Sequence, residues 1–164
     1  SQGEKHEIAG EVLSQGLRFY NGKTEEDAAK ALAYFKEADK LGHMKAARYI
    51  GLLYQEGRGV PKNDKETASW FKKGAEDGDI TSQYLLGKCY EDGTGVERDY
   101  ALALKWYRKS AERGDIIAAP GMTSEALLLE KGLGGERNLP LARQLLTKAA
   151  ALGYAPAKEA LAAL

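Results

Sequence analysis

The chain has 164 residues, a length typical of one domain, and its 24 Lys and Arg residues balance 24 Asp and Glu residues. A chain without net charge has no global attraction for phosphate backbones or anionic lipid, so we expect no nucleic-acid partner. We also expect no membrane insertion, because no apolar run approaches the length that spans a bilayer. The single cysteine, Cys89, excludes an internal disulfide and a zinc site built from several thiolates.

A motif of about 36 residues repeats along the chain. The segment 49–60 returns as the segment 85–96, and Trp70 and Trp106 stand 36 residues apart. Because self-similarity at a fixed period indicates stacked supersecondary units, we expect residues 1–164 to form a single repeat domain. The predicted units span about 10–43, 44–79, 80–115 and 116–154, and the last is three residues longer than each of the two middle units.

Each unit is predicted to form two helices. The first helix carries apolar residues four apart, such as Ile50 and Tyr54, and ends at a glycine, such as Gly57. The second helix is expected to begin after an Asp or Asn that accepts a hydrogen bond from a free backbone N–H. These capping residues are Asp27, Asn63, Asp99 and Asn138. No segment alternates with the period of a strand, so the predicted fold class is all-α, an α-α superhelix in which adjacent helix pairs cover each other.

Aromatic residues of the second helices are the predicted centre of each core. Phe71 stands between two small residues on one ridge, and Trp70 and Trp106 occupy a neighbouring ridge. We expect both tryptophans to be buried, and we expect Trp106→Ala to cost about 3–5 kcal/mol.

The fourth unit and the end of the chain depart from the pattern. We expect the three extra residues around 119–122, where Pro120 would break or delay the first helix. Residues 155–164 place Ala157, Leu161 and Leu164 on one face, which predicts either a capping helix or the first helix of a partial fifth repeat.

Units two and three resemble the Sel-one-like (Sel1-like) repeat, a relative of the tetratricopeptide repeat. The residues that carry the resemblance in unit two are Ala46, Gly51, Tyr54, Gly57, Gly59, Val60, Trp70, Phe71, Ala75 and Gly78. The resemblance implies a right-handed superhelix that serves as an interaction scaffold, of a kind found in bacterial envelope and host-interaction roles. On that ground an exported or periplasmic bacterial location is favoured over a cytoplasmic one.

The resemblance also implies where a partner would bind. By analogy with tetratricopeptide geometry, the first helix of each unit lines a concave groove. The side chains expected to point into this groove are Arg48, Leu52, Gln55, Tyr84, Lys88 and Glu91. A mixture of aromatic, cationic and amide groups suits the recognition of a peptide, although an ordinary solvated helix face would carry the same residues.

Catalytic, cofactor-binding and metal-binding residues are not predicted. His6 and His43 have no zinc-ligand partners at helical spacing, and no nucleophile with a base and an orienting group can be assigned. We therefore expect a non-enzymatic scaffold or adaptor that binds a protein or peptide, and a monomer is favoured. The alternatives are a hydrolase of a cell-wall or antibiotic-like substrate, as proposed for a few relatives, and an oligomerising structural fragment of a larger repeat protein.

Overall fold

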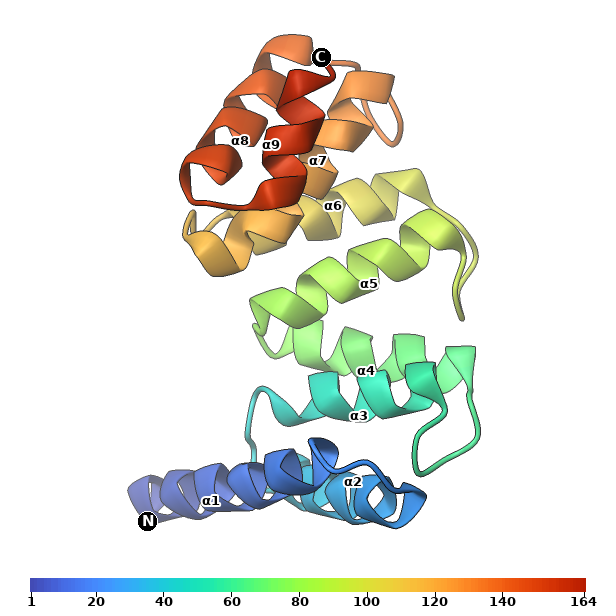
Figure 1. Cartoon of the computed structure of the whole chain (residues 1–164), viewed down its shortest axis with the longest axis vertical. Coiled ribbons are helices and arrows are strands. Elements are labelled where there is room, and N and C mark those ends of the chain that lie inside the picture. The colour runs from blue at the N-terminus through green and yellow to red at the C-terminus, as the bar shows by residue number, and fades with distance from the viewer. The chain divides into compact units, whose positions relative to one another are not determined.

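The computed structural model describes residues 1–164, and its regular structure is entirely helical (Figure 1). This confirms the predicted all-α fold class. The helices in chain order are α1 (Gln2–Tyr20), α2 (Glu25–Lys40), α3 (Ala46–Glu56), α4 (Asp64–Glu76), α5 (Ile80–Asp92), α6 (Tyr100–Ala111), the 3-10 helix η1 (Ile116–Ala118), α7 (Ala119–Lys131), α8 (Leu139–Ala151) and α9 (Ala155–Ala162).

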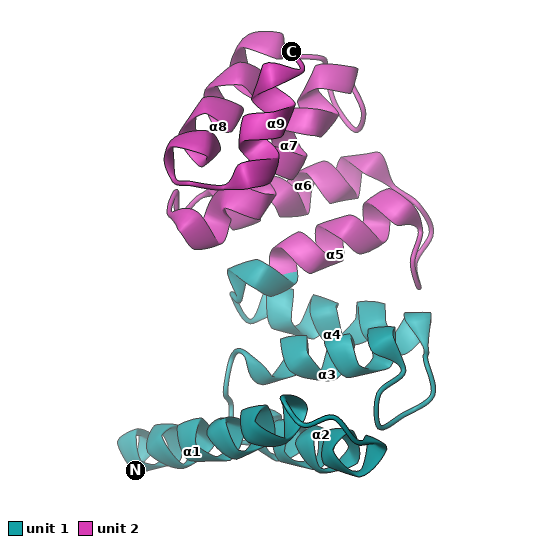
Figure 2. Ribbon diagram, in the orientation of Figure 1, with its two compact units in different colours: residues 1–82 teal, residues 83–164 magenta.

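The chain divides into two compact units, each larger than a single repeat. Unit 1 comprises residues 1–82 and unit 2 comprises residues 83–164, and the division falls inside α5 (Figure 2). In unit 1, α2 packs against both α1 and α3, and α3 packs against α4. In unit 2, α7 packs against both α6 and α8, and α8 packs against α9. Each helix is therefore covered mainly by its neighbours in sequence, as expected for stacked repeats. No helix combines the length and apolar composition that crossing a bilayer requires.

Side chains cap the second helix of each repeat. Asn63, Asp99 and Asn138 each accept a hydrogen bond from the backbone N–H three residues further on, as predicted. In the first repeat the cap is Thr24, whose Oγ1 accepts from the backbone N–H of Asp27 at 3.0 Å. The prediction of Asp27 as the cap is wrong, because α2 begins one turn earlier than its counterparts. Asp27 lies instead in the first turn, where the helix dipole favours a carboxylate.

The first helices α3 and α7 end at glycines, as predicted for Gly57. Gly57 and Gly132 adopt φ values of 66° and 69°, in the left-handed region that strains other L-residues. The N–H of each closes the last turn on a leucine carbonyl, that of Leu53 or Leu128.

A large side chain from the second helix forms the centre of each core. Phe35 and Phe71 in unit 1 and Tyr107 in unit 2 are 0% exposed. Trp70 and Trp106, each one residue earlier, are only partly buried, so the expectation that they form the core is wrong. Successive helical residues point about 100° apart, which turns each tryptophan toward the rim of the core. We therefore expect Trp106→Ala to cost less than about 3 kcal/mol.

The fourth repeat places its extra residues before α7 rather than inside it. They form η1, which Asp115 caps by accepting from the backbone N–H of Ala118. Helix α7 then starts at Ala119 with Pro120 in its first turn. A proline there lacks only an N–H that has no helical acceptor, so it does not break the helix. The expected insertion around 119–122 is wrong for this reason.

Contacts between small residues confirm this register. In unit 1 a β-carbon on Gly74 would overlap the hydroxyl of Ser82. In unit 2 the roles are exchanged, since a β-carbon on Gly121 would overlap the hydroxyl of Ser110. The counterpart of Ser82 is therefore Gly121, 39 residues further on, and not Ala118.

Candidate functional site

Arg48, the first predicted groove residue, is engaged inside unit 1. Its Nε and Nη2 atoms donate to the two carboxylate oxygens of Asp79 at 3.0 and 2.9 Å. The side chains of Arg48 and Asp79 are only 16% and 5% exposed. Asp79 also accepts from the backbone N–H and the hydroxyl of Ser82. This ion pair thus joins α3 to the start of α5. It also occupies the guanidinium donors of Arg48 that would otherwise be available to a partner.

Leu52 and Gln55, the other two predicted groove residues of unit 1, lie on α3 without such an engagement. Leu52 is partly buried and Gln55 is exposed. They are three residues apart, so they occupy neighbouring positions on one face of the helix. The structure leaves both side chains at least partly accessible.

Three predicted groove residues of unit 2, Tyr84, Lys88 and Glu91, follow one face of α5. All three are partly buried. The Tyr84 ring lies 6.0 Å from the ring of Tyr107 between centroids, and Glu91 Oε1 accepts a 2.6 Å hydrogen bond from the Tyr107 hydroxyl. Both Tyr84 and Glu91 therefore contact Tyr107 of α6.

Residues of α7 and of the segment before α9 affect the ionisation of Tyr84 and its surroundings. Burial raises the pKa of the Tyr84 phenol, and Ser124 on α7 opposes that rise. Burial and Tyr84 raise the pKa of Tyr154, which immediately precedes α9, whereas Lys88 lowers it. Leu127, one turn beyond Ser124, is a large apolar side chain with 36% exposure. We call these five residues, Tyr84, Lys88, Ser124, Leu127 and Tyr154, the α5/α7/α9 face.

The α5/α7/α9 face combines hydroxyl, ammonium and aliphatic groups. Burial raises the pKa of both the Tyr84 and Tyr154 hydroxyls, so both phenols stay protonated at neutral pH and can donate hydrogen bonds. The face therefore offers neutral hydroxyls, one ammonium group from Lys88 and one exposed leucine. Neutral donors beside a cation and an apolar side chain suit contact with a polypeptide.

Sequence reasoning found two of these five residues and missed Ser124, Leu127 and Tyr154. The repeat pattern could have predicted Leu127, because this residue follows Ala126, which occupies the repeat position of Gly87. Ser124 and Tyr154 carry no such signal. Their approach to α5 depends on how α7 and α9 pack after the three-residue insertion.

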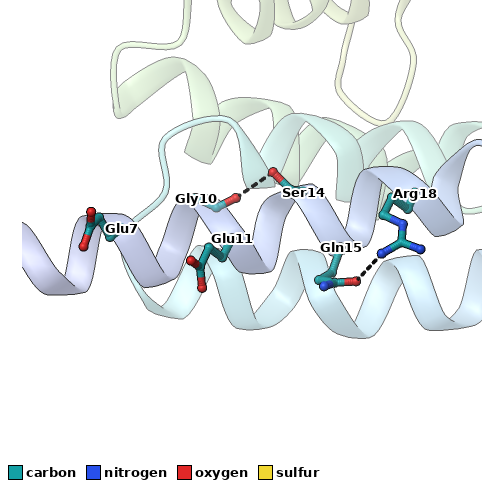
Figure 3. Close-up of a pocket in the computed structure, with 6 residues that line it drawn as sticks. All are labelled: Glu7, Gly10, Glu11, Ser14, Gln15 and Arg18. Carbon is teal, nitrogen blue, oxygen red and sulfur yellow. Dashed lines mark hydrogen bonds between the residues drawn. The ribbon is translucent and has the colours of Figure 1, made fainter.

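An accessible hollow runs along α1 (Figure 3). All of its lining residues belong to that one helix: Glu7, Gly10, Glu11, Ser14, Gln15 and Arg18. The hydroxyl of Ser14 donates to the carbonyl of Gly10, and Arg18 Nη1 donates to Gln15 Oε1. The hollow is thus an open polar strip rather than an enclosed pocket.

Repeat register explains why the strip on α1 is polar. The alignment of Gly16 with Gly51 puts Glu11, Gln15 and Arg18 at the positions of Ala46, Ile50 and Leu53 in α3. Those three α3 residues are 0% exposed. The face that is buried in α3 is therefore exposed and hydrophilic in α1.

Groups suited to metal binding or covalent chemistry do not gather elsewhere. No cluster of three or more His, Cys, Asp or Glu residues is placed to hold a metal ion. Cys89 is buried in α5. The Nδ1 atom of His43 accepts from the backbone N–H of Lys45 at 3.2 Å, and burial together with Lys45 lowers the pKa of the imidazole.

The segments that match a known family correspond to the four repeats of the sequence. The family model described as Sel1 repeat matches residues 12–43, 45–79, 80–115 and 124–154. A comparison of the sequence with curated proteins found no match.

Three solved structures share the fold. A protective antigen of uropathogenic Escherichia coli strains, which displays an SLR fold, is 31% identical with a TM-score of 0.81 over 93% of this chain and 33% of the antigen. A Sel1 repeat protein from Oxalobacter formigenes is 31% identical with a TM-score of 0.79 over 92% of this chain and 57% of that protein. Cysteine-rich protein B of Helicobacter pylori is 23% identical with a TM-score of 0.65 over 85% of this chain and 98% of that protein.

These similarities confirm a helical repeat solenoid as the fold. The chain spans about a third of the Escherichia coli antigen and somewhat more than half of the Oxalobacter formigenes protein.

Proposed function

This chain belongs to the Sel1 repeat family, whose members mediate protein–protein interactions and are typically non-catalytic scaffolds, and from that premise we propose that it binds a protein partner through the α5/α7/α9 face. The proposed ligand is a peptide segment of the partner. The chain supplies shape, hydrogen bonds and charge to that segment and performs no reaction on it.

The observation that carries the proposal is that the Tyr84 ring of α5, whose centroid lies 6.0 Å from that of Tyr107 on α6, stays partly exposed, as does the apolar side chain of Leu127 on α7. A surface assembled across several helices can contact successive residues of an extended segment, which a single helix face cannot. Tyrosine suits such a surface because it offers a large contact area and a hydrogen-bonding hydroxyl with few rotatable bonds. Lys88, four residues after Tyr84 on the same helix, adds a charged group.

Four predicted groove residues stand outside this face. Arg48 is held by Asp79 and Glu91 by the Tyr107 hydroxyl, so we assign both to stability and not to partner recognition. Leu52 and Gln55 remain available on α3 and are proposed as contacts that unit 1 makes with a protein partner.

Site-specific photo-crosslinking tests the proposal. A photoreactive amino acid is placed at Leu127, within the α5/α7/α9 face, and at Thr147, an exposed residue of α8 that serves as the control. After irradiation in cells of the source organism, we expect a discrete crosslinked partner from position 127 and none from position 147. Tyr84→Ala in the same chain should abolish that product while circular dichroism shows an unchanged helical fold.

The opposite pattern would exclude the proposed face. If the same partner is captured from both positions, or if Tyr84→Ala leaves the product from position 127 unchanged, the partner binds elsewhere on the chain.

A further inference from the structure

Two exposed helix faces of the chain, one on α1 and one on α8, are complementary in charge. The α1 strip is the hollow lined by Glu7, Gly10, Glu11, Ser14, Gln15 and Arg18. The α8 strip is a hollow along that helix, lined by Pro140, Arg143, Gln144, Thr147, Lys148 and Ala151. We propose that the α1 strip of one copy of this chain binds the α8 strip of a second copy, through ion pairs between the carboxylates of α1 and the cations of α8.

The charged groups that the proposal uses are free to pair with another molecule. Glu7 and Glu11 are exposed and take part in no ion pair of the chain, and the same holds for Arg143 and Lys148. Arg18, the only cation of the α1 strip, is hydrogen-bonded within the strip and follows Glu11 by two helical turns (Figure 3). The α8 strip contains no acidic residue.

Both strips carry a charge where another repeat buries an apolar side chain. Glu11 stands at the position of Ala46, which is 0% exposed. Arg143 stands at the position of Leu104, which is 2% exposed and lies against the loop after α7, where a β-carbon on Gly135 would be 3.1 Å from Leu104 Cδ2. Helix α9 packs against α8 but leaves Arg143 exposed. The two positions are therefore accessible and of opposite charge.

The α1 strip also has room for a long side chain. Glu7, Gly10, Glu11 and Ser14 follow the spacing i, i+3, i+4, i+7, which borders one hole on a helix surface. A β-carbon on Gly10 would meet nothing within 4 Å, so this hole is open. A guanidinium group that enters it brings five N–H donors between two carboxylates. Arg143 is the residue of the α8 strip that can supply this group.

A contact of this kind is weak and sensitive to salt. Exposed ion pairs contribute little each, and two single-helix faces cover no more than the low end of specific interfaces, about 1,200 Å2. We therefore expect a dissociation constant of about 0.1–1 mM at low ionic strength. Each copy carries one strip of each kind, so the contact is heterologous.

Sedimentation velocity of charge-reversed chains tests the proposal. Glu7→Lys, Glu11→Lys reverses the α1 strip, and Arg143→Glu, Lys148→Glu reverses the α8 strip. At an ionic strength of about 0.01 M, where charges act over about 30 Å, the sedimentation coefficient of the parent should rise between about 10 μM and 1 mM. Each reversed variant should associate at least about tenfold more weakly and show no rise. The parent should also lose the rise in about 1 M salt, where the range of the charges falls to about 3 Å.

Two further chains separate strip pairing from net charge. The chain with all four reversals has the net charge of the parent and again carries opposite charges on its two strips, so it should regain the rise. Glu37→Lys, Glu76→Lys changes the net charge as much as the α1 reversal does, at exposed positions that form no ion pair. This control should keep the rise, and circular dichroism should show the same helical content for every chain.

Crosslinking locates the contact. Ser14→Cys chains and Gln144→Cys chains are mixed and treated with a bifunctional maleimide, while the native Cys89 is buried. We expect a product of two chains at low ionic strength and little of it in about 1 M salt. Ser69→Cys, at an exposed position of α4, replaces Ser14→Cys in the control and should give no such product.

Three results would overturn the proposal. One is a parent whose sedimentation coefficient does not depend on concentration at low ionic strength. Another is an equal loss of association in the Glu37→Lys, Glu76→Lys control and in the α1 reversal, which would assign the effect to net charge. The third is a folded chain with all four reversals that does not regain association, which would refute the pairing of the two strips. The proposed function is independent of these results, because none of the reversed residues belongs to the α5/α7/α9 face.

Discussion

Gly87 of α5 lies directly beneath the ring of Tyr107 of α6, so that a β-carbon at Gly87 would stand 2.5 Å from Tyr107 Cε1. The same close approach joins Gly51 to Phe71 in unit 1, where the corresponding distance is 2.6 Å. In each case the missing side chain of the first helix makes room for a fully buried ring of the second helix. The contact fixes the spacing of the two helices within a repeat.

Repeat four shows the complementary arrangement. Ala126 occupies the position of Gly87, and Leu146 occupies that of Tyr107. Both are 0% exposed. The first helix therefore gains a methyl group at Ala126, and the second helix carries the smaller Leu146 in place of a ring. The larger residue on one helix is matched by a smaller residue on the other.

This relationship predicts a compensated pair of substitutions in unit 1. Gly51→Ala should lower the free energy of unfolding by about 1–3 kcal/mol, because the added methyl group overlaps the Phe71 ring by more than the gain in helix propensity can offset. Phe71→Leu in the Gly51→Ala background should then cost less than Phe71→Leu alone. Urea denaturation of the four proteins of the cycle measures this coupling, and simple additivity of the two single changes would contradict it.

The ion pair between Arg48 and Asp79 predicts sensitivity to acid. Burial alone would raise the pKa of Asp79, but the hydrogen bonds from Arg48 and Ser82 outweigh burial and hold the pKa below its usual value. The contribution is therefore present above the pKa of the unfolded chain and is lost as pH falls below about 4. Asp79→Asn should cost about 3 kcal/mol at pH 7, because it leaves the Arg48 charge partly buried and unpaired.

An exposed pair supplies the control for that experiment. Lys62 and Asp64 form a 3.1 Å ion pair whose side chains are 62% and 49% exposed. Asp64→Asn should change the free energy of unfolding by less than about 1 kcal/mol. Denaturation between pH 7 and pH 3 should show the difference between Asp79→Asn and the parent shrinking toward acid, and a constant difference would refute the assigned role of the carboxylate.

Glu125 behaves in the opposite way to Asp79. Its carboxylate is buried on α7 and paired with Arg108 at 3.2 Å, but Arg108 is 52% exposed. Burial outweighs the attraction of Arg108 and raises the pKa of Glu125. A raised folded-state pKa means that the stability this group provides is complete below its unfolded pKa and declines as pH rises through the folded value.

Two substitutions test the balance at Glu125. Glu125→Gln should leave the free energy of unfolding at pH 7 unchanged or raise it by up to about 1 kcal/mol, because the buried charge is removed together with its desolvation cost. Arg108→Met should lower it, because the buried carboxylate then loses its only ion-pair partner. Thermal unfolding at pH 7 and pH 4 reads out both effects. A larger loss for Glu125→Gln than for Arg108→Met at pH 7 would show that the ion pair, and not burial, dominates.

The polar strip of α1 predicts an effect on self-association. The variant Glu11→Ala, Gln15→Ile, Arg18→Leu gives α1 the residues that α3 buries at the same positions. We expect this variant to self-associate through its new apolar face, with a sedimentation coefficient that rises with protein concentration more steeply than that of the parent. A control with polar replacements at the same positions, Glu11→Gln, Gln15→Glu, Arg18→Lys, should match the parent. Equal behaviour of the apolar variant and this control would show that the strip does not limit association.

The sequence by itself determined the repeat, the two helices of each unit and most of their caps. These features are local, because the cap residues Asn63 and Asp99 act on N–H groups three residues away and the period is set by what each helix pair must bury. The cap of α2 was misassigned because both Thr24 and Asp27 can serve, and only the helix start distinguishes them.

Tertiary structure alone decided which predicted groove residues are engaged within the chain. Arg48 finds Asp79, 31 residues away, and its side chain is only 16% exposed as a result. Glu91 finds the hydroxyl of Tyr107 on α6, 16 residues away. A periodic sequence records which positions are buried in every repeat, but the partner of a side chain across repeats depends on the packing register of whole helices, which no single repeat encodes.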